Sequence, residues 1–202
     1  MSGTVEEPLS KYAVIIAGPN GAGKTTFVSE YLPVSGAEYI SADAIAGTLV
    51  STPNEFDRIR IRAGRLFLKR IQCLIQEEAN LIIEVTLAGR GFRRTIHQLK
   101  NTGYSVTIVF LYLRSPEVCI ARVRNRVMAG GHYVPEEDII RRFYRSKRNF
   151  WRFYKDRVDK WDLFYNSGDS LQGVASGQGD GVAVTNEVLF ELFLDDVRNG
   201  GT

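Results

Sequence analysis

Cysteine and histidine are scarce in this sequence, which has two of each among its 202 residues. Two cysteines make neither a disulfide framework nor a metal site. Because Cys73 and Cys119 both stand among apolar neighbours in helical patterns, we expect both to pack in the core. These features are typical of a reducing compartment, and we predict a cytoplasmic location.

Long hydrophobic runs are also absent. The longest apolar stretches, such as Val106 to Leu113, are far too short to cross a bilayer. The first residues, MSGTVEEPLSKY, are polar and acidic and do not match an export signal. We therefore predict no membrane association, and the length favours one domain over residues 1–202 with a sizeable core.

Several signatures of nucleotide-dependent proteins are missing as well. The sequence has no N-K-x-D motif for guanine, and no apolar run ends in the Asp-Glu pair of a motor ATPase. Residues 176–178 (SGQ) weakly resemble the transporter-ATPase signature, but the Leu-Ser that should precede them is absent. These absences argue against a GTP switch, a motor and a transporter ATPase.

Short apolar runs alternate with helical patterns along most of the chain. Predicted strands cover residues 12–17, 38–41, 81–87, 105–113 and 162–167, and predicted helices cover 24–31, 56–79, 92–99, 136–157 and 186–197, with one more beginning at Pro116. The stretch from Ser167 to Gly181 holds five glycines and is expected to be a loop or a hairpin tip. The alternation predicts an α/β fold with a mostly parallel central sheet and helices on both faces.

Residues 18–25 read GPNGAGKT and match G-x-x-x-x-G-K-[ST], the signature of a phosphate-binding loop, between a predicted strand and a predicted helix. The glycines let backbone N–H groups point at phosphate oxygens, Lys24 can reach the outer phosphates, and the Thr25 hydroxyl can ligate Mg²⁺. The dinucleotide pattern G-x-G-x-x-G is excluded because Thr26 takes the place of its last glycine. The sequence thus predicts a P-loop NTPase or kinase fold with these nucleotide-binding residues: Gly18, Pro19, Asn20, Gly21, Ala22, Gly23, Lys24, Thr25 and Thr26.

Two carboxylates stand where predicted strands run out towards the phosphate loop. Asp43 could accept the proton of an acceptor hydroxyl that attacks phosphorus, or it could cap a helix over residues 44–50. Glu84 lies inside LIIEVTL, where a charge is costly unless it is paired or solvated. With Thr86 on the same strand face, Glu84 could contact a metal-bound water or an acceptor hydroxyl, or it could pair with an arginine.

Positive charge is concentrated in residues 114–160, which hold 13 Lys/Arg against 6 Asp/Glu. Arg122 and Arg126 share one helix face, and two glycines allow a bend before a second basic helix. Phosphoryl transfer needs positive charge on the transferred group, often from arginines on a mobile lid. We predict a helical lid over residues 115–157, with Arg122 and Arg126 as catalytic candidates and His132 and Arg142 as substrate-binding candidates. The alternatives are a solvated face for the arginines and a structural role for His132.

Six segments together resemble the zeta-toxin family of P-loop kinases. They occur in the order of the family and cover nearly the whole chain from residue 12: AGPNGAGKTTF (17–27), SADAI (41–45), IIEVTLAG (82–89), RVRNRVMAGGHYVP (122–135), IIRRFYRS (139–146) and LFYNS (163–167). The phosphate loop is shared by countless proteins, whereas the GGHxVP segment followed by IxRR is much more specific.

The resemblance implies a small-molecule kinase fold with ATP and Mg²⁺ as the phosphoryl donor. In the toxins of the family the acceptor is a UDP-N-acetylamino sugar. By this similarity Asp43 matches the catalytic base, Lys24 the phosphate-loop lysine, Glu84 and Thr86 acceptor-binding positions, and Arg122 or Arg126 a phosphate-clamping arginine. His132 departs from the family, which can carry an arginine there. The chain is more similar to the shorter, stand-alone branch of the family, and an antitoxin-like protein partner is among the expectations that the resemblance implies.

The function expected from these features is transfer of the γ-phosphate of ATP to a hydroxyl of a small acceptor. Two rivals are open from the sequence alone. A kinase of nucleic-acid ends would use the aromatic residues that interleave with arginines in residues 141–154, although their spacing also fits a core stripe. A regulatory module would bind and slowly hydrolyse ATP without any acceptor.

Overall fold

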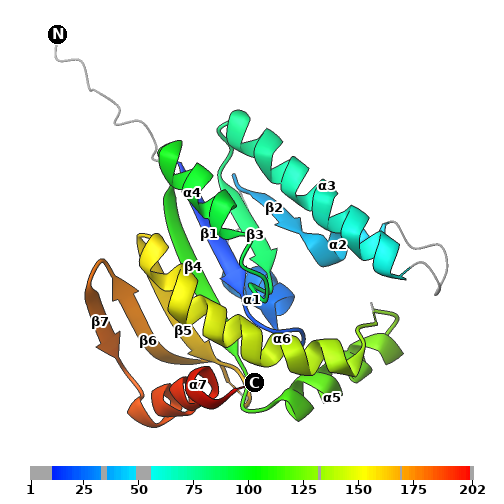
Figure 1. Ribbon diagram of the computed structural model, residues 1–202, viewed down its shortest axis with the longest axis vertical. Coiled ribbons are helices and arrows are strands. Elements are labelled where there is room, and N and C mark those ends of the chain that lie inside the picture. Colours follow the sequence, from blue (N-terminus) through cyan, green and yellow to red (C-terminus); the bar gives the residue numbers. More distant parts are fainter. Residues whose placement is uncertain (1–10, 33–35, 49–55, 132, 169, 201–202) are drawn as a thin grey trace.

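A seven-stranded sheet lies at the centre of the computed structural model, which describes residues 11–32, 36–48, 56–131, 133–168 and 170–200. The strand order is β2-β3-β1-β4-β5-β6-β7 (Figure 1). The first five strands in the chain pair in parallel, whereas β6 and β7 pair antiparallel at one edge. The strands are β1 (Tyr12–Ala17), β2 (Glu38–Ser41), β3 (Leu81–Val85), β4 (Ser105–Tyr112), β5 (Lys160–Tyr165), β6 (Gln172–Gln178) and β7 (Gly181–Val184).

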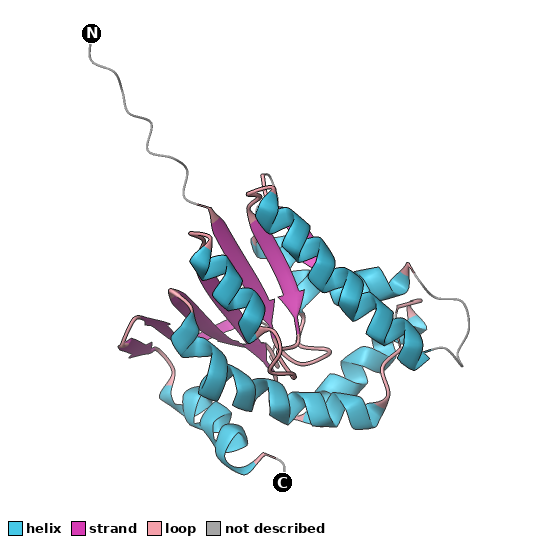
Figure 2. Ribbon diagram, turned by 45° about the horizontal axis from the view of Figure 1, so that its top comes forward, coloured by secondary structure: helices cyan, strands magenta, loops and turns pink. Residues whose placement is uncertain are grey.

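Helices cover both faces of this sheet (Figure 2). They are α1 (Lys24–Tyr31), α2 (Ala42–Gly47), α3 (Phe56–Gln76), α4 (Arg93–Asn101), α5 (Pro116–Met128), α6 (Glu136–Asn149) and α7 (Glu187–Asn199). A π-helical turn (Phe150–Tyr154) and a 3₁₀ turn (Lys155–Arg157) continue α6. The mostly parallel α/β fold predicted from the sequence is confirmed.

The buried core is split between the two faces, because successive residues of a strand point to opposite sides. In β1, Ile15 packs in a cluster with residues of α3, α4 and α7, whereas Ile16 packs in a second cluster with residues of α1, α5 and α6. Both isoleucines are fully buried. A strand covered on both faces needs apolar residues at every position, which explains the continuous apolar runs of the sequence.

The glycine-rich stretch was expected to be a loop or a hairpin tip, and it is partly a strand. Residues 172–178 are β6, which pairs with β5, and the two residues between β6 and β7 form a hairpin turn. Here glycine provides room rather than flexibility: a Cβ at Gly177 would lie 2.3 Å from the ring of Trp161. The sequence pattern could not distinguish a glycine required by close packing from one required by a turn.

Within the described ranges, no helix combines the length and apolarity that a membrane span requires. The two cysteines are free, and Cys119 is fully buried in the core, as expected, whereas Cys73 is only partly buried.

Candidate active site

The phosphate loop forms the turn from β1 into α1, at the carboxyl end of the middle one of the five parallel strands. Lys24 is 6% exposed, and its Nζ donates a hydrogen bond to the Pro19 carbonyl at 3.0 Å. Asn20 is 1% exposed, and its Oδ1 accepts a hydrogen bond from Arg142 Nη1 of α6 at 3.0 Å. The conformation of the loop is therefore stabilised by a hydrogen bond from its own Lys24 and by one from Arg142 of α6.

The geometry of the loop requires glycine at Gly18, Gly21 and Gly23, as two of these positions illustrate. Gly18 has φ 141°, and a Cβ there would lie 2.2 Å from the Leu111 carbonyl oxygen. Gly23 has φ 86°, and a Cβ there would lie 2.5 Å from Asn166 Nδ2, which donates to the Ala22 carbonyl at 2.9 Å. Sequence reasoning gave Asn166 no role. Its only signals were its place near the end of a predicted strand and within the LFYNS segment.

Glu84 is buried at the end of β3, opposite Ser41 of β2 and Ile16 of β1, with 5% exposure. Its Oε2 accepts hydrogen bonds from Thr25 Oγ1 (3.0 Å) and from the Tyr39 hydroxyl (2.5 Å), and its Oε1 lies 4.0 Å from Lys24 Nζ. These partners compensate the burial of the carboxylate. The sequence left open an arginine as the partner of Glu84, but the cation next to Glu84 is Lys24 of the phosphate loop.

Tyr39 was not predicted as a site residue. Burial, with the added effect of the Glu84 carboxylate, raises the pKa of its phenol far above the ordinary value. The hydroxyl therefore stays protonated and remains a donor to Glu84 at physiological pH. No motif marks such a residue, because the contact joins two neighbouring strands that are distant in sequence.

Asp43 lies in the first turn of α2, but the cap of that helix is Ser41, whose Oγ accepts a hydrogen bond from Ala44 N at 3.5 Å. The capping role that the sequence left open for Asp43 thus belongs to Ser41. Asp43 is partly exposed and lines a pocket beside the phosphate loop. Its carboxylate is available to a ligand in that pocket.

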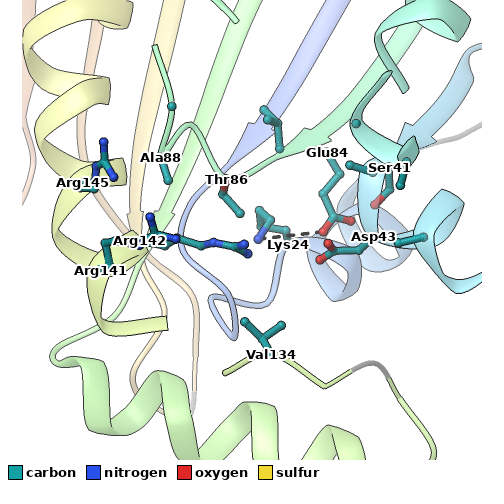
Figure 3. A pocket seen from close by; sticks show the side chains of 16 residues that line it. Lys24, Ser41, Asp43, Glu84, Thr86, Ala88, Val134, Arg141, Arg142 and Arg145 are labelled. Carbon is teal, nitrogen blue, oxygen red and sulfur yellow. Dashed lines mark ion pairs between the residues drawn. The ribbon is translucent and has the colours of Figure 1, made fainter. Parts of the chain in front are cut away.

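The pocket has a volume of about 410 Å³ and is polar on two sides (Figure 3). Lys24, Ser41, Asp43 and Glu84 form what we call the sheet wall. Arg141, Arg142 and Arg145 of α6 form the helix wall. Further lining residues come from α2, α3, the end of β3, the segment after β3 and the segment before α6: Ala42, Ala46, Ala63, Gly64, Val85, Thr86, Ala88, Gly89 and Val134. This volume is in the range of small-molecule sites.

The helix-wall arginines carry different contacts. Arg142 reaches from α6 to the phosphate loop and lies 3.3 Å from Asp138, with a side chain that is 17% exposed. Arg141 also pairs with Asp138 but is 49% exposed, and Arg145 is exposed. Of the three helix-wall arginines, Arg142 is thus the one that contacts the phosphate loop.

The other predicted lid residues are not brought to this pocket. Among the residues that the structure describes, Arg122 and Arg126 of α5 are half-buried and are not part of the pocket lining. Arg126 packs at the glycine pair instead, where its carbonyl accepts a hydrogen bond from Gly131 N at 2.8 Å. Their catalytic role stays a prediction, and His132 lies outside the described residues.

The aromatic residues interleaved with the arginines are largely core. Phe143, Phe150 and Tyr154 are fully buried, and Trp151 and Phe153 pack against the core cluster. Packing in the core, rather than stacking on bases, accounts for most of these aromatic residues, although Ile140 at the start of the expected stripe is exposed.

A family model described as AAA domain (AAA_33) matches residues 14–146, more than half of the chain. The chain belongs to this family. The matched segment contains the phosphate loop, Asp43, Glu84 and most of α6. Both walls of the pocket are therefore built from the family domain.

Two curated proteins are similar at the sequence level. An uncharacterised protein of Haemophilus influenzae is 28% identical over 132 residues, which cover 65% of this chain and 91% of that protein. A cytidylate kinase of Archaeoglobus fulgidus is 28% identical over 165 residues, which cover 77% of this chain and 85% of that protein.

Solved structures show the same fold. The AvrRxo1-ORF1:ORF2 complex with ATP has a TM-score of 0.76 at 17% identity, covering 96% of this chain and 67% of that chain. A structure of the PezAT toxin-antitoxin system of Streptococcus pneumoniae has a TM-score of 0.64 at 18% identity, covering 94% and 80%. At such identities the likeness establishes the fold alone, which is a P-loop kinase-like α/β fold.

Proposed function

We propose that the protein is an ATP-dependent phosphotransferase that moves the γ-phosphate of ATP to a hydroxyl of a small acceptor. One observation carries the proposal: Lys24 of the phosphate loop and the Asp43 carboxylate line the same pocket, and three arginines line its other side. A phosphate-binding lysine and a candidate base that face one cavity are the arrangement that in-line transfer requires.

The contacts support the following proposed roles. Lys24 and Arg142 hold the outer phosphates, and Asp43 takes the proton of the acceptor hydroxyl as its oxygen bonds to the γ-phosphorus. The bond from the γ-phosphorus to the β,γ-bridging oxygen breaks, and ADP leaves. The buried Asn20 Nδ2 has no hydrogen-bond partner among the described residues, and a phosphate oxygen would supply one.

Mg²⁺ fits the donors at the base of the loop. The exposed Thr25 hydroxyl and the Glu84 carboxylate lie side by side, and Mg²⁺ favours hydroxyl, carboxylate and phosphate oxygens. We assign the metal to Thr25, with Glu84 behind it. When bound, Mg²⁺ would neutralise charge on the β- and γ-phosphates.

The acceptor is assigned to the part of the pocket near Asp43 and Thr86. By resemblance to the zeta-toxin family, we propose a UDP-N-acetylamino sugar as the first acceptor to test. Glu84 is committed to Thr25, Tyr39 and Lys24, which favours the metal side of the site over acceptor binding. Thr86, which is partly exposed and lines the pocket, is the better acceptor contact.

A cytoplasmic location and an antitoxin-like protein partner also stay proposals. The partner is suggested by the fold likeness to the PezAT system. Co-purification of a small protein with the tagged chain from its own host would support it, and isolation of the chain alone at full recovery would contradict it.

The acceptor test is a phosphoryl-transfer assay with Mg-ATP and a panel of UDP-sugars, simple sugars and nucleosides. Mass spectrometry should find an acceptor about 80 Da heavier, the mass that one phosphoryl group adds. A Lys24→Ala variant serves as the inactive control. ATP binding or hydrolysis without any heavier acceptor would contradict the proposal and favour the regulatory rival.

A further inference from the structure

The segment that follows β3 is held by the C-terminal end of the basic helix. We call residues 86–91 the β3 loop. Asn149 Nδ2 donates hydrogen bonds to the carbonyls of Leu87 (3.0 Å) and Ala88 (2.9 Å). The Tyr154 hydroxyl donates to the Gly89 carbonyl at 2.6 Å. Two side chains thereby bind three consecutive carbonyls, an arrangement that we call the carbonyl clasp.

Both donors of the clasp are buried. Asn149 is 6% exposed and Tyr154 is fully buried. Buried polar side chains are retained where they are hydrogen-bonded, and both of these use their donors on the same loop. A third contact lies beside the clasp, where the Arg90 guanidinium stands 4.3 Å from the centre of the Phe153 ring. The helix end therefore contacts four successive residues of the β3 loop.

The β3 loop and the helix end that holds it both have irregular backbone conformations. Leu87 has φ 52°, a left-handed conformation that is uncommon for residues other than glycine, and its side chain is buried in the core. Tyr154 belongs to the π-helical turn that begins directly after Asn149. Strained residues persist where their surroundings over-determine them, and π-helical turns occur frequently at functional sites.

The clasped loop forms one side of the pocket. Thr86, Ala88 and Gly89 line it, and Figure 3 shows Thr86 and Ala88 along the pocket with Arg145 on one side and Lys24 on the other. α6 carries the three helix-wall arginines and ends at Asn149, one of the two donors of the clasp. One continuous segment thus supplies the arginines and fixes the loop that faces them.

We propose that Asn149 and Tyr154 are positioning residues for the acceptor. Their hydrogen bonds hold the β3 loop with Leu87 in its left-handed conformation. This fixes the positions of Thr86 and of the loop backbone relative to Asp43. This inference rests on the proposed function, because it gives the loop side of the pocket to the acceptor. Within the described residues, neither side chain lines the pocket itself, so the effect on the acceptor is indirect.

The test compares Tyr154→Phe and Asn149→Leu with a matched control, Tyr104→Phe. Tyr104 is equally buried, and its hydroxyl donates to the Ala79 carbonyl at 2.8 Å, just before β3 and away from the pocket. Tyr154→Phe and Tyr104→Phe each lose one hydroxyl and keep the ring. For each variant we would measure hydrogen exchange of residues 86–91, kcat, and the KM values for acceptor and for ATP.

The clasp predicts that Tyr154→Phe raises the acceptor KM about threefold to tenfold, the change expected from one lost hydrogen bond. The KM for ATP should stay within about twofold, exchange should accelerate at residues 86–91, and Asn149→Leu should show both effects more strongly, because it loses two hydrogen bonds. Tyr104→Phe should leave the acceptor KM and the exchange of the β3 loop unchanged.

An acceptor KM in Tyr154→Phe no higher than in Tyr104→Phe would overturn the inference, as would accelerated exchange spread evenly over the chain. If the wild type phosphorylates no acceptor in the panel, the proposed function fails. The clasp is then judged by exchange alone: local acceleration at residues 86–91 supports it, and unchanged exchange overturns it.

Discussion

Buried polar contacts fix Lys24 and Glu84 on the sheet wall of the pocket, whereas two of the three arginines on the helix wall are exposed. Lys24 and Glu84 are at most 6% exposed, and Glu84 has three polar partners. On the helix wall, Arg141 and Arg145 are exposed, and Arg142 alone is tied to the phosphate loop. The sheet wall is preorganised before any ligand arrives, while the helix wall can adjust to the ligand.

This difference predicts that substitution of the buried sheet-wall residues Lys24 and Glu84 affects both chemistry and stability, whereas helix-wall substitutions mainly affect ligand binding. The largest effect is expected for Lys24→Gln. Loss of the lysine removes charge at the transferred phosphate and should lower kcat/KM about 10²- to 10³-fold. It also leaves the buried Glu84 without its cation, which costs about 3 kcal/mol of folding free energy.

Steady-state kinetics and urea unfolding measure these two effects of Lys24→Gln. Adding Glu84→Gln removes the unpaired charge and should restore part of the stability without restoring activity. If Lys24→Gln unfolds at the wild-type urea concentration, the lysine and the carboxylate are not coupled, and the contrast between the walls is wrong.

On the helix wall, Arg142→Gln should raise the KM for ATP about tenfold, since one charged hydrogen bond to phosphate is lost. Its midpoint of unfolding should fall less than that of Lys24→Gln, because the Arg142 side chain is 17% exposed and that of Lys24 is 5% exposed. Arg152→Gln, an exposed arginine of the π-helical turn, is the matched control. An equal change of KM in both variants would mean that Arg142 acts only through the general charge of the segment.

The side of α6 that faces away from the pocket carries a pH-dependent contact. Lys147 is fully buried, and its Nζ donates to Asp196 of α7 (2.5 Å) and to the Leu113 carbonyl (3.1 Å). Burial lowers the pKa of this lysine from 10.5 to about 8. Between these values the unfolded chain binds more protons than the folded one, so the free energy of unfolding should rise with pH in that window.

Chemical unfolding between pH 7 and pH 10.5 tests this contribution, with Lys147→Met as the comparison. The difference in stability between wild type and variant should move in favour of the wild type as pH rises through about 8. A difference that does not change with pH would show that Lys147 titrates alike in both states.

The smallest effect separates two neighbouring residues of the sheet wall. Ser41→Ala should cost about 1 kcal/mol of folding free energy, because Ser41 caps α2. Asp43→Asn should cost less than about 0.5 kcal/mol, as is usual for a substitution away from a cap or the core. Urea unfolding of both variants measures this, and the reverse order would return the capping role to Asp43.

Local sequence predicted the parts of the site that local chemistry defines. The phosphate loop is a contiguous motif, Asp43 was singled out by its place after a predicted strand, and Thr86 by sharing a strand face with Glu84. The contacts of Asn166, Tyr39 and Asn149 were not predicted, because each joins segments 45 to 144 positions apart in the chain. A sequence read alone shows which residues can donate or accept, but strand order decides which of them meet.

The arginines illustrate the same limit. Arg122, Arg126 and Arg142 all fit a basic lid by composition, yet Arg142 alone of the three lines the described pocket. Helical periodicity fixes which residues share a face, but the direction of that face depends on how α5 and α6 pack on the sheet. The clasp at the end of α6 is hidden from sequence for the same reason.

The proposed mechanism depends on Asp43 acting as the base. The most direct measurement compares Asp43→Asn with Asp180→Asn, an exposed aspartate at the hairpin tip, in transfer from Mg-ATP and in equilibrium binding of ATP. We predict that Asp43→Asn loses transfer by at least about 10²-fold while binding ATP like the wild type, and that Asp180→Asn keeps both. Normal transfer by Asp43→Asn would contradict the assignment of the base and, with it, the mechanism.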